Sequence, residues 1–169
     1  KFLRTPKDLS IVYDYITTNI LTMVSKERFE TIDRLSNLLR HDNIEGDIVE
    51  CGCWRGGMSM YLAHSFPERQ IWVCDSFEGF EDLSQATIRW TAPDPHRPSF
   101  SEVAVNIDGQ SHGPQSLIAP YDKVIKDFEG IGLSEKEGII FLKGFVRNTL
   151  APDTCEIKKI ALLRIDVDA

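Results

Sequence analysis

Apolar residues follow two patterns along the chain, and each pattern predicts a different kind of element. Short apolar runs bounded by polar or glycine residues predict four buried strands, at Ile48–Cys51, Ile71–Cys74, Ile139–Leu142 and Ile160–Ile165. Apolar positions at helical spacing predict helices over Leu9–Leu21, Lys26–Arg40 and Tyr121–Gly130, with Ser25 as the N-cap of the second. Alternation of strands and helices indicates an α/β fold, in which a parallel sheet carries helices on both faces.

Two regions stand outside this alternation. We expect residues 1–45 to form a helical cover or lid over a sheet domain of residues 46–169. Residues 79–120 show no sustained periodicity, and we expect them to form a mobile segment that binds an acceptor, with His96 and His112 as solvated loop residues. The fourth strand ends close to Ala169, so we expect the sheet to be truncated there and to continue in a longer protein.

Composition narrows the class of protein. The chain has 169 residues, of which 42% are hydrophobic and 27% are charged, and this is typical of one globular domain. A net charge of -7 argues against nucleic acid or an anionic membrane as a partner. The sequence shows neither a transmembrane run nor a signal-peptide pattern, so we expect a cytoplasmic protein. We expect the cysteines to be small reduced thiols in strand contexts; they are Cys51, Cys53, Cys74 and Cys155. Cys51 and Cys53 are two residues apart, so we expect them on one face of a strand.

The first strand leads into a glycine-rich turn that opens a helix. In an open α/β sheet, ligands bind at the carboxyl ends of the strands, where the helices begin. This end of the sheet is its carboxyl edge. The turn residues assigned to a ligand site are Glu50, Gly52, Arg55, Gly56 and Gly57. A diphosphate requires a glycine where this turn has Trp54, and Glu50 would repel phosphate. The turn therefore suits a cationic or hydroxyl-bearing ligand such as S-adenosylmethionine (SAM).

Asp75 ends the second strand and is the next acidic residue at this edge. A carboxylate at that place can accept hydrogen bonds from both ribose hydroxyls of an adenosine, and Ser76 beside it is assigned to the same cofactor site. The alternative is that Gly52 and Gly57 only form a turn and that Asp75 only caps a helix.

Asp166 and Asp168 follow the fourth strand and form a third acidic feature at the same edge. Two such carboxylates can hold a hard cation such as Mg²⁺, whose other positions are filled by water or substrate oxygens. A carboxylate that is not a ligand could accept a proton from a metal-polarised hydroxyl. The alternative is that both are solvated acids at a strand end.

Four sequence blocks, in order, resemble the macrocin O-methyltransferase (TylF-type) family. The blocks are Gly46–Gly57, Ile71–Phe80, Phe141–Phe145 with Asn148–Leu150, and Leu162–Asp168. The resemblance implies a Rossmann-like fold of the class I methyltransferase type. It also implies a SAM-dependent and Mg²⁺-dependent O-methyltransferase that acts on a sugar hydroxyl of a natural product or glycoside. By the family's pattern Asp166 is a metal ligand and Asp168 the general base, while Glu50, Gly52 and Asp75 line the SAM site.

The resemblance implies a small sugar-bearing acceptor as partner, and a homo-oligomer is possible. The family's remaining metal ligands would lie beyond Ala169, so we expect the 169 residues alone to be inactive. Two other interpretations stay open. One is a metal-dependent glycosyltransferase, which also uses Asp-x-Asp, and the other is a non-catalytic Rossmann-like binding domain. Titration with SAM and with UDP-sugars distinguishes the three.

Overall fold

A computed structural model describes residues 4–79, 118–153 and 155–167 of the chain. Its sheet has four parallel strands in the order β3-β2-β1-β4. The strands are β1 (Asp47–Cys51), β2 (Ile71–Asp75), β3 (Ile139–Lys143) and β4 (Ile160–Ile165). The four predicted strands and their parallel arrangement are confirmed. The prediction that all four are buried is wrong for β4, none of whose residues is buried within the described structure; Leu163 is 46% exposed and Ile165 is 64% exposed. Most of the 79–120 segment, with His96 and His112, lies outside the described residues.

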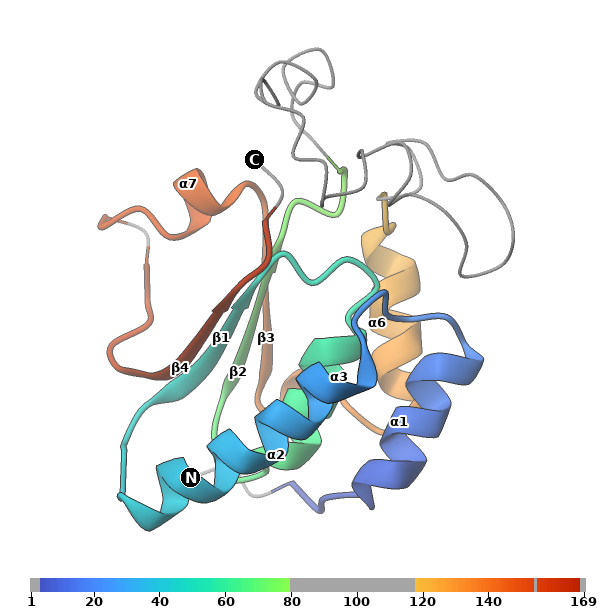
Figure 1. The fold of residues 1–169 in the computed structure, drawn as a ribbon. Coiled ribbons are helices and arrows are strands. Elements are labelled where there is room, and N and C mark those ends of the chain that lie inside the picture. The colour runs from blue at the N-terminus through green and yellow to red at the C-terminus, as the bar shows by residue number, and fades with distance from the viewer. Residues whose placement is uncertain (1–3, 80–117, 154, 168–169) are drawn as a thin grey trace, which may run out of the picture.

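Among the described residues, four helices of nine residues or more gather on one side of the sheet (Figure 1). They are α1 (Leu9–Thr18), α2 (Lys26–His41), α3 (Gly57–Ser65) and α6 (Tyr121–Gly130). Ser25 occupies the N-cap position of α2, as predicted. α1 ends before the predicted Leu21 because the chain turns at Asn19, its C-cap, and Ile20 has a φ of +53°.

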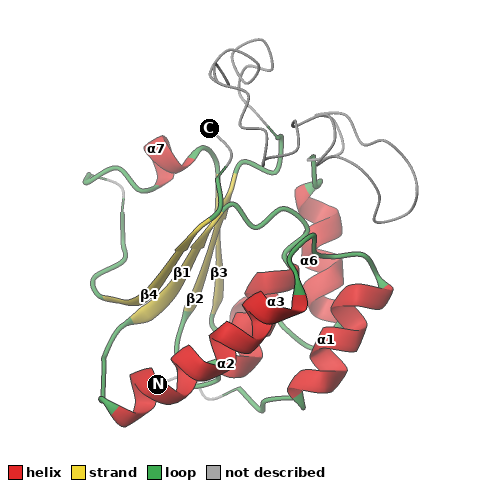
Figure 2. Ribbon diagram, viewed as in Figure 1, coloured by secondary structure: helices red, strands yellow, loops and turns green. Residues whose placement is uncertain are grey.

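The core between these helices and the sheet is continuous. It includes Val12 and Ile16 of α1, Phe29 of α2, Leu62 of α3 and Ile48 of β1, all buried. All nine residues of α3 are buried, because α1 and α2 pack on it from outside while the sheet lies beneath it (Figure 2). The helices of residues 1–45 therefore share one core with the sheet, and the proposed division of the chain at residue 46 stays a prediction.

The other side of the sheet carries a smaller cluster. Its buried members are Val49, Cys51, Trp72 and Cys74. Among the described residues this face is covered by the short helix α7 (Val146–Thr149), through Val146, and by Leu150 and Ile157. Helices thus occupy both faces, as predicted, but very unequally. A 3-10 helix, η2 (Glu135–Glu137), leads into β3.

Cys51 and Cys53 face opposite sides of the sheet, although their spacing suggested one strand face. β1 ends at Cys51, and Gly52, with a φ of +83°, turns the chain so that Cys53 packs in the helix-side core. Cys51, Cys53 and Cys74 are buried free thiols. Within the described ranges, no helix is both long enough and apolar enough to cross a membrane.

Candidate functional site at the carboxyl ends of the strands

Asp75 organises the turn between β1 and α3. Its Oδ2 accepts hydrogen bonds from the backbone N–H groups of Cys53, at 2.8 Å, and Trp54, at 3.0 Å. Its Oδ1 accepts a third from the N–H of Phe77, at 2.8 Å. One carboxylate therefore holds the turns that follow two neighbouring strands. Asp75 lies at the predicted edge, and its immediate structural role is to fix the backbone that would face a ligand.

The glycines of this turn are required by close packing within the protein. A Cβ atom at Gly52 would collide with the carbonyl oxygen of Asp166, where β4 leaves the sheet, and one at Gly57 would lie 2.5 Å from the Leu21 carbonyl oxygen. The N–H of Gly57 donates to that same Leu21 oxygen at 3.0 Å. The first N–H of α3 is therefore already paired, and the ends of β1 and β4 are locked together.

Two further residues assigned to the cofactor make contacts within the protein. The guanidinium of Arg55 lies 4.5 Å from the ring centroid of Trp54 and donates to the Ile20 carbonyl at 3.0 Å. The Ser76 hydroxyl donates to the Gly79 carbonyl at 2.8 Å and accepts from the N–H of Glu78. Both side chains stabilise loops around the candidate site, and their contact with a cofactor stays a prediction.

Glu50 is enclosed under α3. Its side chain is fully buried, its Oε2 accepts from the Ser59 hydroxyl, and its Oε1 lies 2.5 Å from Nη1 of Arg164. Burial raises the pKa of the Glu50 carboxyl from 4.5 to about 7, while Arg164 and the Ser59 hydroxyl act in the opposite direction. Both carboxylate oxygens thus have partners inside the protein.

Asp166 joins the same network from the end of β4. Its Oδ2 lies 2.5 Å from Nη2 of Arg164, and its side chain is 46% exposed. Its backbone N–H donates to the Cys51 carbonyl, which continues the pairing of β4 with β1. Among the described residues no group of three or more side chains could hold a metal ion. Asp168, the predicted base, lies outside the described residues.

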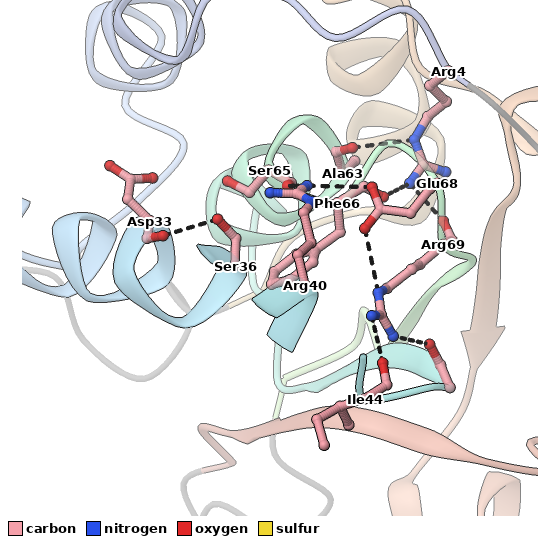
Figure 3. A network of polar contacts seen from close by, with 11 residues as sticks. Arg4, Asp33, Ser36, Arg40, Ile44, Ala63, Ser65, Phe66, Glu68 and Arg69 are labelled. Atoms are coloured by element: carbon pink, nitrogen blue, oxygen red, sulfur yellow. Dashed lines mark hydrogen bonds and ion pairs between the residues drawn. The ribbon is translucent and has the colours of Figure 1, made fainter. Parts of the chain in front are cut away.

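A different polar network lies at the amino ends of the strands, which form the amino edge of the sheet (Figure 3). Arg4 is buried and donates to the carbonyls of Ala63, Phe66 and Arg69, at 3.1, 2.7 and 2.6 Å. A fourth bond, at 2.5 Å, reaches the Glu137 carbonyl. Burial lowers the pKa of Arg4 to about 10. These bonds cap the last turn of α3 and tie the N-terminal segment to the loops before β2 and β3.

A cavity of about 450 Å³ opens beside this network, between the start of α1, α2 and the end of α3. His64 and Ser65 line it, and within the described residues His64 Nε2 and Ser65 Oγ have no hydrogen-bond partner. None of the residues predicted for the cofactor or metal lines this cavity.

Sequence reasoning assigned no role to Arg164 or Ser59. Arg164 carried a usable signal, because a charged residue inside an apolar strand needs a buried partner. Ser59 carried none, since it is one polar residue in a helix whose every side is buried. The residues that the sequence analysis did assign, and that the structure describes, lie together at the carboxyl ends of β1, β2 and β4. They are Glu50, Gly52, Arg55, Gly56, Gly57, Asp75, Ser76 and Asp166.

A sequence model of the family described as macrocin-O-methyltransferase (TylF) matches residues 14–169. A tetracenomycin 4'-O-methyltransferase of Streptomyces olivaceus, which acts on 8-demethyl-8-(2,3-dimethoxy-alpha-L-rhamnosyl)-tetracenomycin-C, is 31% identical over 155 residues. That alignment covers 87% of this chain and 52% of the relative. The demethyldecarbamoylnovobiocin O-methyltransferase of Streptomyces niveus is 29% identical over 156 residues, covering 89% and 53%. The chain therefore spans about half the length of these curated relatives.

The solved structure of the O-methyltransferase NovP resembles the fold. It superposes with a TM-score of 0.66 at 21% identity, covering 94% of this chain and 71% of that chain. At this level of identity the match shows a shared fold, which is that of a class I methyltransferase up to its fourth strand.

Proposed function

Because this chain belongs to the TylF family of macrocin O-methyltransferases, we propose that its protein transfers a methyl group from SAM to a sugar hydroxyl of a natural product or glycoside, with Mg²⁺ as a second cofactor. The family match over residues 14–169 carries this proposal. The name of one relative describes a rhamnosyl-bearing substrate, which favours a sugar acceptor. We further propose a cytoplasmic enzyme that acts on a small acceptor.

The proposed cofactor site is the turn after β1 with the end of β2. Glu50, Asp75 and Asp166 make this edge acidic, with one arginine among them, and this charge suits a cationic ligand better than a diphosphate. When bound, SAM supplies a methyl group on a positively charged sulfur. Asp75 would keep the Cys53 and Trp54 backbone in place and offer the remaining lone pairs of its carboxylate to ribose hydroxyls.

The proposed metal and base roles belong to the acids that follow β4. Asp166 fits a hard cation, because it is a half-exposed carboxylate at a strand end and has one oxygen, Oδ1, beside the oxygen that Arg164 holds. When bound, Mg²⁺ lowers the pKa of a hydroxyl that it coordinates. Asp168 would accept the proton of the acceptor hydroxyl, two residues further along the chain.

The test uses the full-length protein, with SAM and a UDP-sugar as ligands and a glycoside as the methyl acceptor. Calorimetric titration should show binding of SAM and no binding of a UDP-sugar, and EDTA should abolish methylation of a glycoside without displacing SAM. Asp168→Asn should lower kcat by roughly 10²–10⁴-fold with little change in SAM affinity. Asp122→Asn, at an exposed acid of α6, is the matched control and should methylate at the wild-type rate. Binding of the UDP-sugar alone, or turnover that is insensitive to EDTA, would contradict the proposal.

A further inference from the structure

The cavity at the amino edge lies where three helices meet. The start of α1, α2 and the last turn of α3 surround it, and its lining includes Asp33 and Ser36 of α2 and Ser65 of α3 (Figure 3). Its volume of about 450 Å³ falls in the range of roughly 300–1,000 Å³ that is typical of small-molecule sites. One water occupies only about 30 Å³. The cavity is therefore large enough for a small organic molecule.

Two consecutive residues at the end of α3 line the cavity with buried polar groups. The side chains belong to His64 and Ser65, each a residue that is 4% exposed. Within the described residues, His64 Nε2 and Ser65 Oγ have no hydrogen-bond partner. A buried polar atom without a partner costs free energy, so such atoms are normally paired. Because both line one cavity, a single occupant can supply the partner of each.

The backbone determines which proton His64 offers to that occupant. The N–H of Lys7 donates to His64 Nδ1 at 3.2 Å. A ring nitrogen that accepts a hydrogen bond carries no proton, so the proton of the neutral imidazole is on Nε2. Burial, with repulsion from Lys7 and Arg4, lowers the pKa of the imidazole to about 4, which keeps the ring neutral at pH 7. His64 therefore presents one N–H donor to the cavity.

The charged residues of the lining balance one another. Lys7 and Arg40 are basic, and Asp8 and Asp33 are acidic. The carboxylate of Asp33 accepts the hydroxyl of Tyr61, at 2.9 and 3.0 Å, and an ionised carboxylate has lone pairs for further donors. Equal numbers of acids and bases give an ion of either sign no net attraction. The lining therefore favours a neutral ligand.

A hydroxyl group fits both unpartnered atoms. Its oxygen can accept from the N–H of His64, and its proton can be donated to the hydroxyl oxygen of Ser65. Further hydroxyls would find acceptors in the two carboxylates of the lining. The apolar residues of the lining offer surface to a carbon skeleton; they are Pro6, Leu9 and Pro67. Hydroxyl groups on a compact carbon ring meet all of these requirements.

We propose that the cavity at the amino edge is a second binding site, which takes a neutral polyhydroxylated ligand of the sugar type and holds it through His64 and Ser65. A free sugar and the sugar of a glycoside share this chemistry. None of the residues predicted for the cofactor or metal lines the cavity. The site is therefore separate from that of the proposed methyl transfer and does not depend on it.

The test follows the ring nitrogens of His64 by nuclear magnetic resonance in the full-length protein, labelled with ¹⁵N-histidine. His64→Gln identifies the resonance by removing it. The probes are D-glucose as a free sugar, phenyl glucoside as a glycoside, tetrahydropyran as a ring without hydroxyls, and acetate as an anion. Glucose or the glucoside should shift the Nε2 resonance saturably at millimolar concentrations, and the tighter of the two identifies the source of the sugar. Tetrahydropyran and acetate should give no saturable shift.

Ser65→Ala tests the second contact. It should weaken binding of the sugar about fivefold, as expected for the loss of one neutral hydrogen bond. Without ligand, its melting temperature should not fall, because the hydroxyl that is removed has no partner in the protein. Thr18→Ala is the matched control, since Thr18 is likewise the last residue of a helix but is exposed and does not line the cavity. It should leave the affinity for the sugar unchanged.

Several outcomes would overturn the inference. If no probe shifts the His64 resonance saturably, the cavity holds water only. If acetate binds more tightly than either sugar, or tetrahydropyran binds equally well, the ligand class is wrong. A lower melting temperature of unliganded Ser65→Ala would show that its hydroxyl is already paired within the full-length protein. Titration of the same sample with SAM tests the proposed function separately, since either ligand can bind when the other does not.

Discussion

Arginines that are buried or mostly enclosed lie at both edges of the sheet, and Arg4 and Arg164 bind different acceptors. At the amino edge, Arg4 donates to four main-chain carbonyls. Arg69 likewise donates to the carbonyls of Gly46 and Ile44, at 2.7 and 2.6 Å. At the carboxyl edge, Arg164 donates to the carboxylates of Glu50 and Asp166. The contrast holds for Arg4 and Arg164. Arg69 also pairs with the Glu68 carboxylate at 3.4 Å, and at the carboxyl edge Arg55 donates to the Ile20 carbonyl.

The acceptor indicates what each arginine does. Main-chain carbonyls at the end of a helix have no partner within the helix, so an arginine that binds them completes the architecture. A carboxylate at the ligand edge carries a charge that a cation or a hydroxyl can share. We therefore expect changes of Arg4 to act on stability, and changes at the carboxyl edge to act on ligand affinity.

The largest effect on stability should follow Arg4→Met. It leaves four carbonyls around the end of α3 without their donor, and we expect the free energy of unfolding to fall by about 3–5 kcal/mol. Urea denaturation measures the loss. Arg34→Met is the control, since Arg34 is an exposed arginine of α2 and substitutions at such surface positions usually change the free energy of unfolding by about 0.5 kcal/mol or less. Equal losses in the two variants would remove the distinction between buried and exposed arginines.

His64 adds a pH dependence to the same edge. Burial, with repulsion from Lys7 and Arg4, lowers the pKa of its imidazole from 6.5 to about 4. The unfolded chain binds the proton more tightly, so this contribution to stability is complete above pH 6.5 and is lost as the pH falls towards 4. We expect a loss of roughly 2 kcal/mol, less than the full linkage value because the site borders an open cavity.

The measurement compares wild type with His64→Gln between these two pH values. Other titrating groups contribute to both proteins, so their effects cancel in the difference. As the pH falls, the free energy of unfolding of the wild type should decrease relative to that of His64→Gln. Parallel profiles would show that His64 is protonated equally in the folded and unfolded states.

The smallest effect is expected at the carboxyl edge, from Asp75→Asn. The amide nitrogen of asparagine cannot accept the N–H groups that Oδ2 now accepts, so the turn of Cys53 and Trp54 should shift. SAM binding should weaken about tenfold, which is about 1.4 kcal/mol. Asp47→Asn is the control, because Asp47 lies at the other end of β1 and accepts from the Trp72 indole. An unchanged SAM Kd in Asp75→Asn would separate this turn from the cofactor site.

The local sequence pattern was sufficient to predict the longer helices and the strands. The helix predicted over Tyr121–Gly130 has those bounds in the structure, and the strand predicted over Ile160–Ile165 matches as well. The helix was identified because a helix with one buried side repeats its apolar positions at a fixed spacing, and the strand was identified because it is a short run of mostly apolar residues. The four-residue helix α7 and the 3-10 helix η2 were missed, because neither is long enough to repeat such a spacing.

The partners of the site residues could not be predicted in the same way. Gly52 was assigned to the ligand site, and the structure shows that the carbonyl of Asp166 approaches it closely; its contact with a ligand stays a prediction. Cys51 and Cys53 were expected on one face, but the left-handed backbone at Gly52 sends them to opposite faces. In each case the sequence identified a constrained position and could not identify the atom that constrains it.

The sequence by itself determined the order and type of the elements, the acidic character of the carboxyl edge and the family. These depend on spacing along the chain and on residue type, and both are present before the chain folds. Only the tertiary structure decided that β1 lies between β2 and β4, and that Glu50 meets Arg164 across 114 positions of sequence. The physical reason is that hydrogen-bond pairing between strands sets which distant residues become neighbours. An ion pair buried in this way depends on that register and on the helix packed above it.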